Sequence, residues 1–264
     1  FQPQTTAELQ TAVNLWVSDN AAALETYGEI NTWDVSLITN MFELFIDKAT
    51  FNDDISNWDV SNVTNMQHVF FNASNFNQDL SSWDMSSVTT VRGMFFNASN
   101  FNQDLSSWDM SSVTTLQALF YGASSFNGDI STWDVSNVTN LVWALRSPSF
   151  NGDISNWDVS SVTDMNATFE GSISFNGDIS NWNVSNVTSM WGVFKNASNF
   201  NQDISGWDVS SATATAGMFE NAASFNQDIS SWDVSNITNM TNMFGGTNAL
   251  SDENKCAIHT SFSS

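Results

Sequence analysis

The chain has 264 residues, of which 28 are Asp or Glu and only 5 are Lys or Arg, for a formal net charge of −23. This balance excludes nucleic acid as a partner, because no basic stripe exists to displace phosphate counterions, and it disfavours anionic membranes. A hydrophobic content of 41%, with 12 Trp and 21 Phe, excludes a disordered acidic tail. No run of residues is long and apolar enough to predict membrane insertion, and the single Cys256 excludes an intrachain disulfide.

Residues 1–29 lie outside the repeat described below and are predicted to form an N-terminal helical cap. Thr5 is followed three residues later by Glu8, which is a capping-box pattern, and apolar residues then fall at helical spacing. We expect one helix over about 6–18 and a second, short one near 21–27. A stack of repeats needs such a cap because its terminal unit exposes apolar surface and unpaired backbone.

Residues 30–248 repeat themselves about every 25 residues. The period is marked by Trp33, Trp58, Trp83, Trp108, Trp133, Trp157, Trp182, Trp207 and Trp232, with one step of 24 residues. A fixed period in the twenties is typical of a solenoid, in which neighbouring coils bury one another's apolar faces.

Within one unit, Ile55, Trp58 and Val60 have the spacing of a leucine-rich-repeat strand. Residues 63–70 then switch to helical spacing. The sequence therefore predicts an α/β repeat, namely a leucine-rich-repeat-like right-handed solenoid with short parallel strands on one face and short helices on the other. Residues 249–264 are expected to be a C-terminal cap or the start of a continuing region, with a helix beginning near Ser251.

The motif F-N-x-D-[IL]-S-x-W-D-[VM]-S-x-V-T-x-M, seen in residues 51–66 and again in each later unit, resembles the DUF285 repeats of BspA-like leucine-rich-repeat surface proteins. The resemblance covers about 30–248. It implies a leucine-rich-repeat-like solenoid on a secreted or cell-surface protein, and so an extracellular location. It implies no activity.

Polar residues also recur in columns. The Asn column that contains Asn52 is expected to be a structural ladder that pairs open backbone groups. Stacked Asp carboxylates about 4.8 Å apart repel by roughly 1 kcal/mol in water. Either backbone N–H groups and Ser hydroxyls offset this repulsion, or a bound cation such as calcium does. The candidate metal ligands are Asp59, Asp84, Asp109, Asp134 and Asp158.

Positions just after Met66 and its equivalents vary freely between small, aromatic and charged residues, and most of the basic residues lie there. One interpretation is an unconstrained, solvated helix face. The other is a recognition strip, because large aromatic and basic side chains anchor interfaces. The candidate partner-binding residues are Tyr121, Trp143, Arg146, Trp191 and Lys195.

No Ser/His/Asp or Cys/His arrangement is present, and carboxylates repeated in every coil do not resemble a singular catalytic site, so we expect no enzyme. The sequence predicts a secreted or cell-surface binding and adhesion solenoid that recognises a protein or a glycan. The alternative is self-association, as a structural subunit of an extracellular filament, sheath or matrix with calcium as a bridge. A third hypothesis is binding of ice or polysaccharide through the row of Thr residues that contains Thr64.

Overall fold

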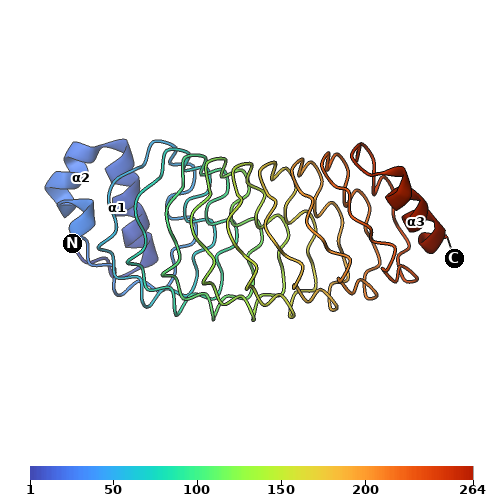
Figure 1. The fold of residues 1–264 in the computed structure, drawn as a ribbon. Helices are drawn as coiled ribbons and strands as arrows, with labels where there is room; N and C mark the ends of the chain where they lie inside the picture. Colours follow the sequence, from blue (N-terminus) through green and yellow to red (C-terminus); the bar gives the residue numbers. More distant parts are fainter. Residues whose placement is uncertain (264) are drawn as a thin grey trace.

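The computed structural model describes residues 1–263. Coils stacked side by side run from helices at the N-terminal end to a helix at the C-terminal end (Figure 1). The helices are α1 (Thr6–Ser18), α2 (Asn20–Tyr27), the 3-10 helix η1 (Ile30–Thr32) and α3 (Asp252–Phe262). In Figure 1, α1 lies against the first coil and α2 lies outside it.

Helix α1 begins where its sequence predicts. The Thr5 side chain accepts a hydrogen bond from the backbone N–H of Glu8, which satisfies one of the free donors of the first turn. The buried face of the helix carries Leu9, Val13 and Trp16, the apolar residues at helical spacing. The two N-terminal helices expected from the sequence are therefore present.

The interior of the stack is built from apolar columns. Each repeated Trp is almost fully buried, and from Trp58 onward its indole N–H donates to a carbonyl of the preceding coil, whereas that of Trp33 donates to Gly28. For example, Trp108 donates to the carbonyl of Leu80 at 2.9 Å and Trp133 donates to that of Leu105 at 2.9 Å. Phe rings stack beside them, with centroids of Phe70 and Phe95 5.6 Å apart. Each coil is thus completed by its neighbours.

The predicted α/β solenoid with strands on one face and helices on the other is wrong. Within residues 1–263 no helix lies between η1 and α3, and the strand-type pairing is limited to isolated parallel bridges such as Asn65 with Thr90. The expected strand at 55–60 is closed by local turns, because the Trp58 N–H donates to the carbonyl of Ile55 and the Val63 N–H to that of Val60. These turns prevent an extended backbone.

Backbone pairing between coils occurs instead in the segment that was predicted to be helical. The N–H groups of Met66, His68 and Phe70 donate to carbonyls of the next coil at 2.9–3.0 Å. The intervening Val69 and Phe71 donate within their own coil, to the residue three positions earlier. We call residues 64–73 and their equivalents the bonded wall.

This alternation explains why helical spacing was misleading. Successive turns closed by hydrogen bonds between residues three apart repeat apolar positions at nearly the spacing of a helix. No helix forms, because residues in the left-handed backbone conformation interrupt the turns. In the coil of Met66 these are His68 and Asn72, with φ of 58° and 57°. A residue in that region ends a right-handed helix.

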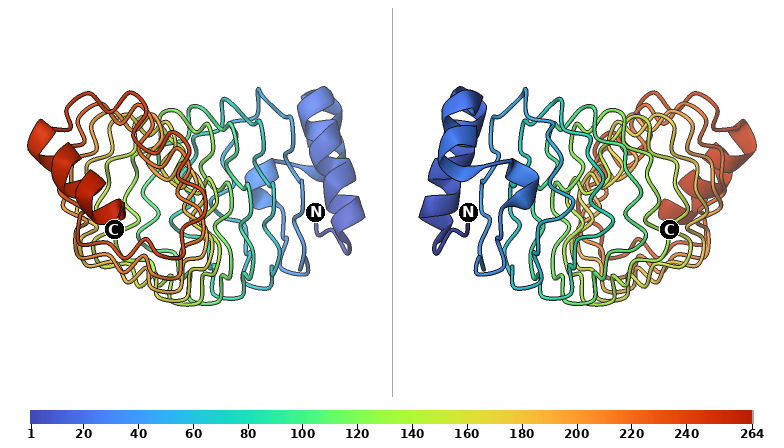
Figure 2. Two further views of the ribbon diagram at one scale, coloured as in Figure 1. Left: turned by 90° about the vertical axis from the view of Figure 1, so that its right-hand side faces the viewer. Right: turned by 90° about the vertical axis from the view of Figure 1, so that its left-hand side faces the viewer.

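Residues 54–62 and their equivalents form a second wall, which we call the tryptophan wall. Here side chains bridge the coils, as when the Ser82 hydroxyl donates to the Ser56 carbonyl at 2.6 Å. Trp ring centroids of successive coils are 6.1–6.3 Å apart, whereas on the bonded wall the inward Phe70 and Phe95 are 5.6 Å apart and the outward Phe71 and Phe96 are 4.4 Å apart. The spacing therefore differs between the walls, and the coil planes turn along the stack when it is viewed from its ends (Figure 2).

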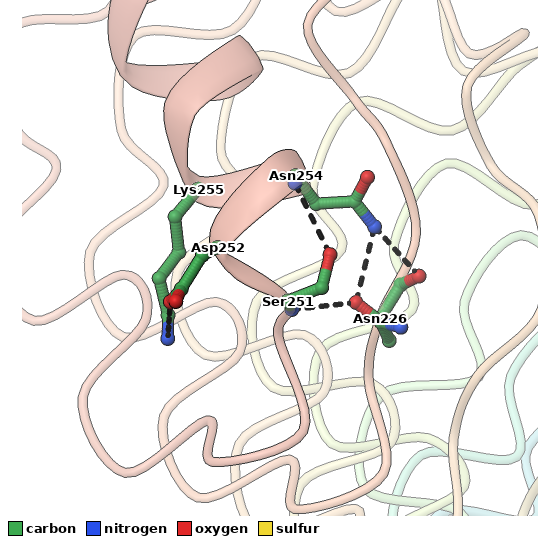
Figure 3. Close-up of polar contacts among 5 residues, drawn as sticks. All are labelled: Asn226, Ser251, Asp252, Asn254 and Lys255. Atoms are coloured by element: carbon green, nitrogen blue, oxygen red, sulfur yellow. Dashed lines mark hydrogen bonds and ion pairs between the residues drawn. The ribbon is translucent and has the colours of Figure 1, made fainter.

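The Asn column is a ladder, as expected. The side-chain carbonyl of each Asn accepts the backbone N–H of the equivalent residue in the next coil, for example Asn52 from Asn77 at 2.8 Å. The last rung joins Asn226 to Ser251, which caps α3 by accepting the Asn254 N–H (Figure 3). The Asn254 side-chain amide donates to both the backbone carbonyl and the side-chain carbonyl of Asn226, each at 3.0 Å. The ladder thus anchors α3.

Candidate functional site

The outward-facing side chains of the bonded wall form one column along the stack, which we call the outer row. It consists of Phe71, Phe96, Tyr121, Arg146, Glu170, Lys195 and Glu220, and all of its members are partly exposed. In its first half the rings stack nearly parallel, with centroids 4.4 Å apart for Phe71 and Phe96 and 4.3 Å for Phe96 and Tyr121. The rings therefore cover one another's faces and leave their edges to solvent.

Arg146 ends the aromatic half of the row. Its guanidinium carbon lies 4.3 Å from the centroid of the Tyr121 ring, within cation–π range, and its Nε is 3.4 Å from Glu170 Oε2. One coil further, Lys195 Nζ is 2.7 Å from Glu220 Oε2. The second half of the row is thus a set of alternating charges that neutralise one another.

The column that precedes the outer row is held in the left-handed conformation. Gly93, Gly192 and Gly217 occupy it with φ of 57–62°, where glycine is favoured. Trp143 occupies it with φ 56°, which is strained for a bulky residue. Its ring meets Tyr121 edge-on at 5.9 Å. The sequence pattern indicates that these positions vary freely. Their backbone conformation is in fact constrained, although the identity of the side chain varies.

The predicted partner-binding residues fall into two groups. Tyr121, Trp143 and Arg146 contact one another. Trp191, which is 39% exposed, lies two coils further along with Lys195 Nζ 5.8 Å from its ring. Glu170 lies between the two groups in the row. The aromatic part of the surface also extends to Phe71 and Phe96, which were not among the predicted partner-binding residues.

The predicted metal ligands each hold a protein donor. Asp59 Oδ1 accepts the Ser61 N–H at 3.1 Å and its hydroxyl at 2.6 Å, and Asp84, Asp109, Asp134 and Asp158 each accept the N–H of the Ser two positions on at 3.0 Å. Hydrogen bonds from the Ser86 hydroxyl and N–H hold the pKa of the Asp84 carboxyl below its usual value. These serine hydrogen bonds are one of the two offsets to carboxylate repulsion that the sequence left open. Within residues 1–263, no His, Cys, Asp and Glu side chains form a group of three or more that could hold a metal ion.

Sequence reasoning missed a second exposed surface, at the last coil. Val234, Ile237, Met240 and Phe244 are partly exposed there, whereas the corresponding residues of the preceding coil are buried. The signal was available, because a repeat that ends near residue 248 leaves its last coil without a following one.

In the part of the chain that the structure describes, no helix has the length and apolar character to cross a membrane. A family model described as Mycoplasma protein of unknown function, DUF285, matches residues 15–115, 101–147 and 142–256. No curated protein and no solved structure matches the chain.

Proposed function

The chain belongs to the DUF285 family, whose model matches it in three overlapping segments, and from this premise we propose that it is a non-enzymatic, secreted or cell-surface protein that binds and adheres to a protein partner through the outer row. The observation that carries the proposal is the continuous line of partly exposed rings from Phe71 to Tyr121, closed by Arg146. Contiguous exposed aromatic surface on a chain this hydrophilic calls for an explanation. Tyr, Trp and Arg are the side chains that most often anchor interfaces.

The balance of charge along the outer row also supports its role as a binding surface. The protein carries a formal charge of −23, yet the ion-paired half of the outer row is balanced, with Arg146 beside Glu170 and Lys195 beside Glu220. A partner that approaches along the row meets little of the repulsion or desolvation cost that isolated carboxylates impose.

Ring orientation favours a protein over a glycan. Sugar rings stack on the faces of aromatic side chains, but the faces in the outer row are covered by neighbouring rings only about 4.3–4.4 Å away. The exposed edges suit carbonyl oxygens and aliphatic side chains, because the edge of an aromatic ring is its positive part.

Adhesion of the purified chain to immobilised extracellular proteins and to a glycan array tests the proposal. We expect binding to a protein, weakened by about 2 kcal/mol in Tyr121→Ala, on the outer row, and in Trp191→Ala, whose ring lies 5.8 Å from Lys195 Nζ of that row, with nearly unchanged melting temperatures. Leu37→Ala is the matched control, since Leu37 is 50% exposed but lies outside the row. Lost stability with intact binding in the row variants would show that the row is only a tolerant surface.

The alternative is a structural subunit of an extracellular filament, sheath or matrix. Head-to-tail stacking of copies is opposed by α1, which covers the first coil (Figure 1). The alternative therefore requires contacts between the sides of the stack, with calcium bridging the acidic column that contains Asp59 and Asp84. Mass measurement in solution with millimolar calcium and with chelator separates the two proposals, because a monomer in both conditions removes the filament.

A further inference from the structure

The interface between coils has a direction. In residues 66–72 of the bonded wall and their equivalents, alternate N–H groups donate to carbonyls of the next coil, whereas the Thr just before them donates to the preceding coil, as Thr238 does to the Thr213 carbonyl at 2.9 Å. At the last junction Thr215, Gly217, Phe219 and Asn221 donate to carbonyls of the final coil at 2.7–2.9 Å. The corresponding N–H groups of the final coil have no acceptor within residues 1–263; they belong to Met240, Asn242, Phe244 and Gly246.

Three of these four residues use their carbonyl groups within the final coil. The carbonyls of Met240, Asn242 and Phe244 accept the N–H groups of Met243, Gly245 and Thr247 in local turns. At residues 240, 242, 244 and 246 the C-terminal edge of the stack therefore presents donors. A second copy offering the same edge would place donors opposite donors.

At the N-terminal edge of the stack, side chains of α1 pair with the outward-facing carbonyl groups. There the carbonyls of Asn40 and Leu44 face outward, and α1 supplies donors to both, from the Thr6 hydroxyl at 2.7 Å and the Gln10 amide at 3.0 Å. Helix α3 lines a cavity with Phe244, but within residues 1–263 it supplies no acceptor to the four unpaired N–H groups of the last coil. It is fixed at Asn226 and, through the Ser261 hydroxyl, at the Ser230 carbonyl.

Apolar side chains of the last coil are partly exposed beside these unpaired N–H groups. Val209, Ala212 and Phe219 are 0–1% exposed, whereas their equivalents Val234, Ile237 and Phe244 are partly exposed. The Phe column runs through this edge, with centroids of Phe219 and Phe244 5.6 Å apart.

Beyond Phe244 lies a cavity of about 330 Å³, lined by Phe244, Leu250, Ile258 and Phe262 with Lys255 and His259. The next ring of the column would stand beside Phe244, where this cavity is. The cavity is large enough for one aromatic side chain, since pockets of a few hundred Å³ hold groups of this size.

We propose that the C-terminal edge binds a segment of another polypeptide as an added coil, whose alternate carbonyls accept the N–H groups of residues 240, 242, 244 and 246 and whose aromatic side chain enters the cavity beside Phe244. The chemistry of the occupant follows from continuity with the coil–coil interface, which makes the same contacts along the stack. Addition of a chain segment to an unpaired edge is an established mode of recognition. The site is separate from the outer row and does not depend on the function proposed for it.

A peptide that copies residues 87–99 of this chain is a suitable probe. It carries two aromatic residues, of which Phe95 is the equivalent of Phe244 and Phe96 belongs to the outer row, and it has Gly93 and Asn97 where the coil needs left-handed backbone. We expect saturable binding by calorimetry, weakened at least tenfold when the peptide carries Phe95→Ala. Tyr121→Ala in the protein should leave the affinity for this peptide unchanged, which separates this edge from the outer row.

Amide hydrogen exchange keeps the test independent of any folding defect. The N–H groups of residues 240, 242, 244 and 246 should exchange fast in the free protein and become protected by the wild-type peptide. Absence of binding, or binding without protection of these amides, overturns the proposal. Protection in the peptide-free protein together with a dimer in sedimentation also overturns it, because the occupant would then be a second copy.

Discussion

The two walls of each coil are held together by different chemistry. On the bonded wall backbone N–H groups reach the next coil directly, whereas on the tryptophan wall indole and hydroxyl side chains do so. The difference explains which columns vary within this chain. Where a buried indole bridges the coils, its identity is fixed, as in the Trp column, whereas the hydroxyl column of Ser82 also contains Thr132 and Gly206. Where the backbone bridges them, the outward side chains are free to change, and the outer row is the result.

The largest test of this comparison is Trp108→Ala. It removes a buried ring and the bond to the Leu80 carbonyl, so we expect a loss of about 3–5 kcal/mol in the free energy of unfolding. Phe96→Ala, on the outer row, should cost no more than about 1 kcal/mol. Denaturant titration of both variants gives the answer, and equal losses would contradict the distinction between the walls.

Asn102→Ala tests a bridging side chain without creating a large cavity. The substitution removes the acceptor of the Asn127 N–H, which lies 2.8 Å away. We expect a loss of about 1 kcal/mol, since water replaces part of the bond at this exposed site. Asn102→Asp keeps the acceptor oxygen and should lose less. If the two variants are equally stable, the ladder contributes nothing measurable.

Ala118→Gly should act in the opposite direction. Ala118 has φ 55°, on the bonded wall, where a side chain is strained and glycine is not. We expect a gain of roughly 0.5–1 kcal/mol, because relief of strain is partly offset by the flexibility of glycine in the unfolded chain. Gly93→Ala is the reverse control, since its new Cβ would lie 2.5 Å from the His68 ring. A destabilised Ala118→Gly protein would show that the left-handed position carries no strain.

Acid should weaken the tryptophan wall by a small amount. Serine hydrogen bonds hold the pKa of Asp84, Asp134 and Asp203 below the usual value of 3.8. A lowered pKa contributes stability that is complete above 3.8 and is lost as the pH falls through the folded-state pKa. Melting temperature should therefore be flat near neutral pH and fall only below about pH 4. Ser86→Ala should make the fall shallower; an unchanged acid profile would remove this contribution.

Local signals in the sequence predicted the local features. The capping pattern of Thr5 and Glu8 located α1, and the Trp spacing predicted the buried column. The predicted strand of the tryptophan wall and the predicted helix of the bonded wall are both wrong. The spacing of Ile55 and Trp58 occurs in turns as well as in strands. Nothing in the residue type of Ala118 or Trp143 marks a left-handed backbone. The ring stack of the outer row depends on the distance between coils, which a single repeat does not contain.

Amide hydrogen exchange of the whole chain tests the central claim most directly. In the bonded wall, alternate N–H groups such as those of Met66, His68 and Phe70 are paired between coils and should exchange slowly. In the tryptophan wall, the N–H of Ser56 is held only by the exposed carboxylate of Asp54 and should exchange faster. Slow exchange throughout residues 55–60 with fast exchange in 66–70 would contradict the account, because it would place the inter-coil backbone pairing on the wall where the sequence first suggested a strand.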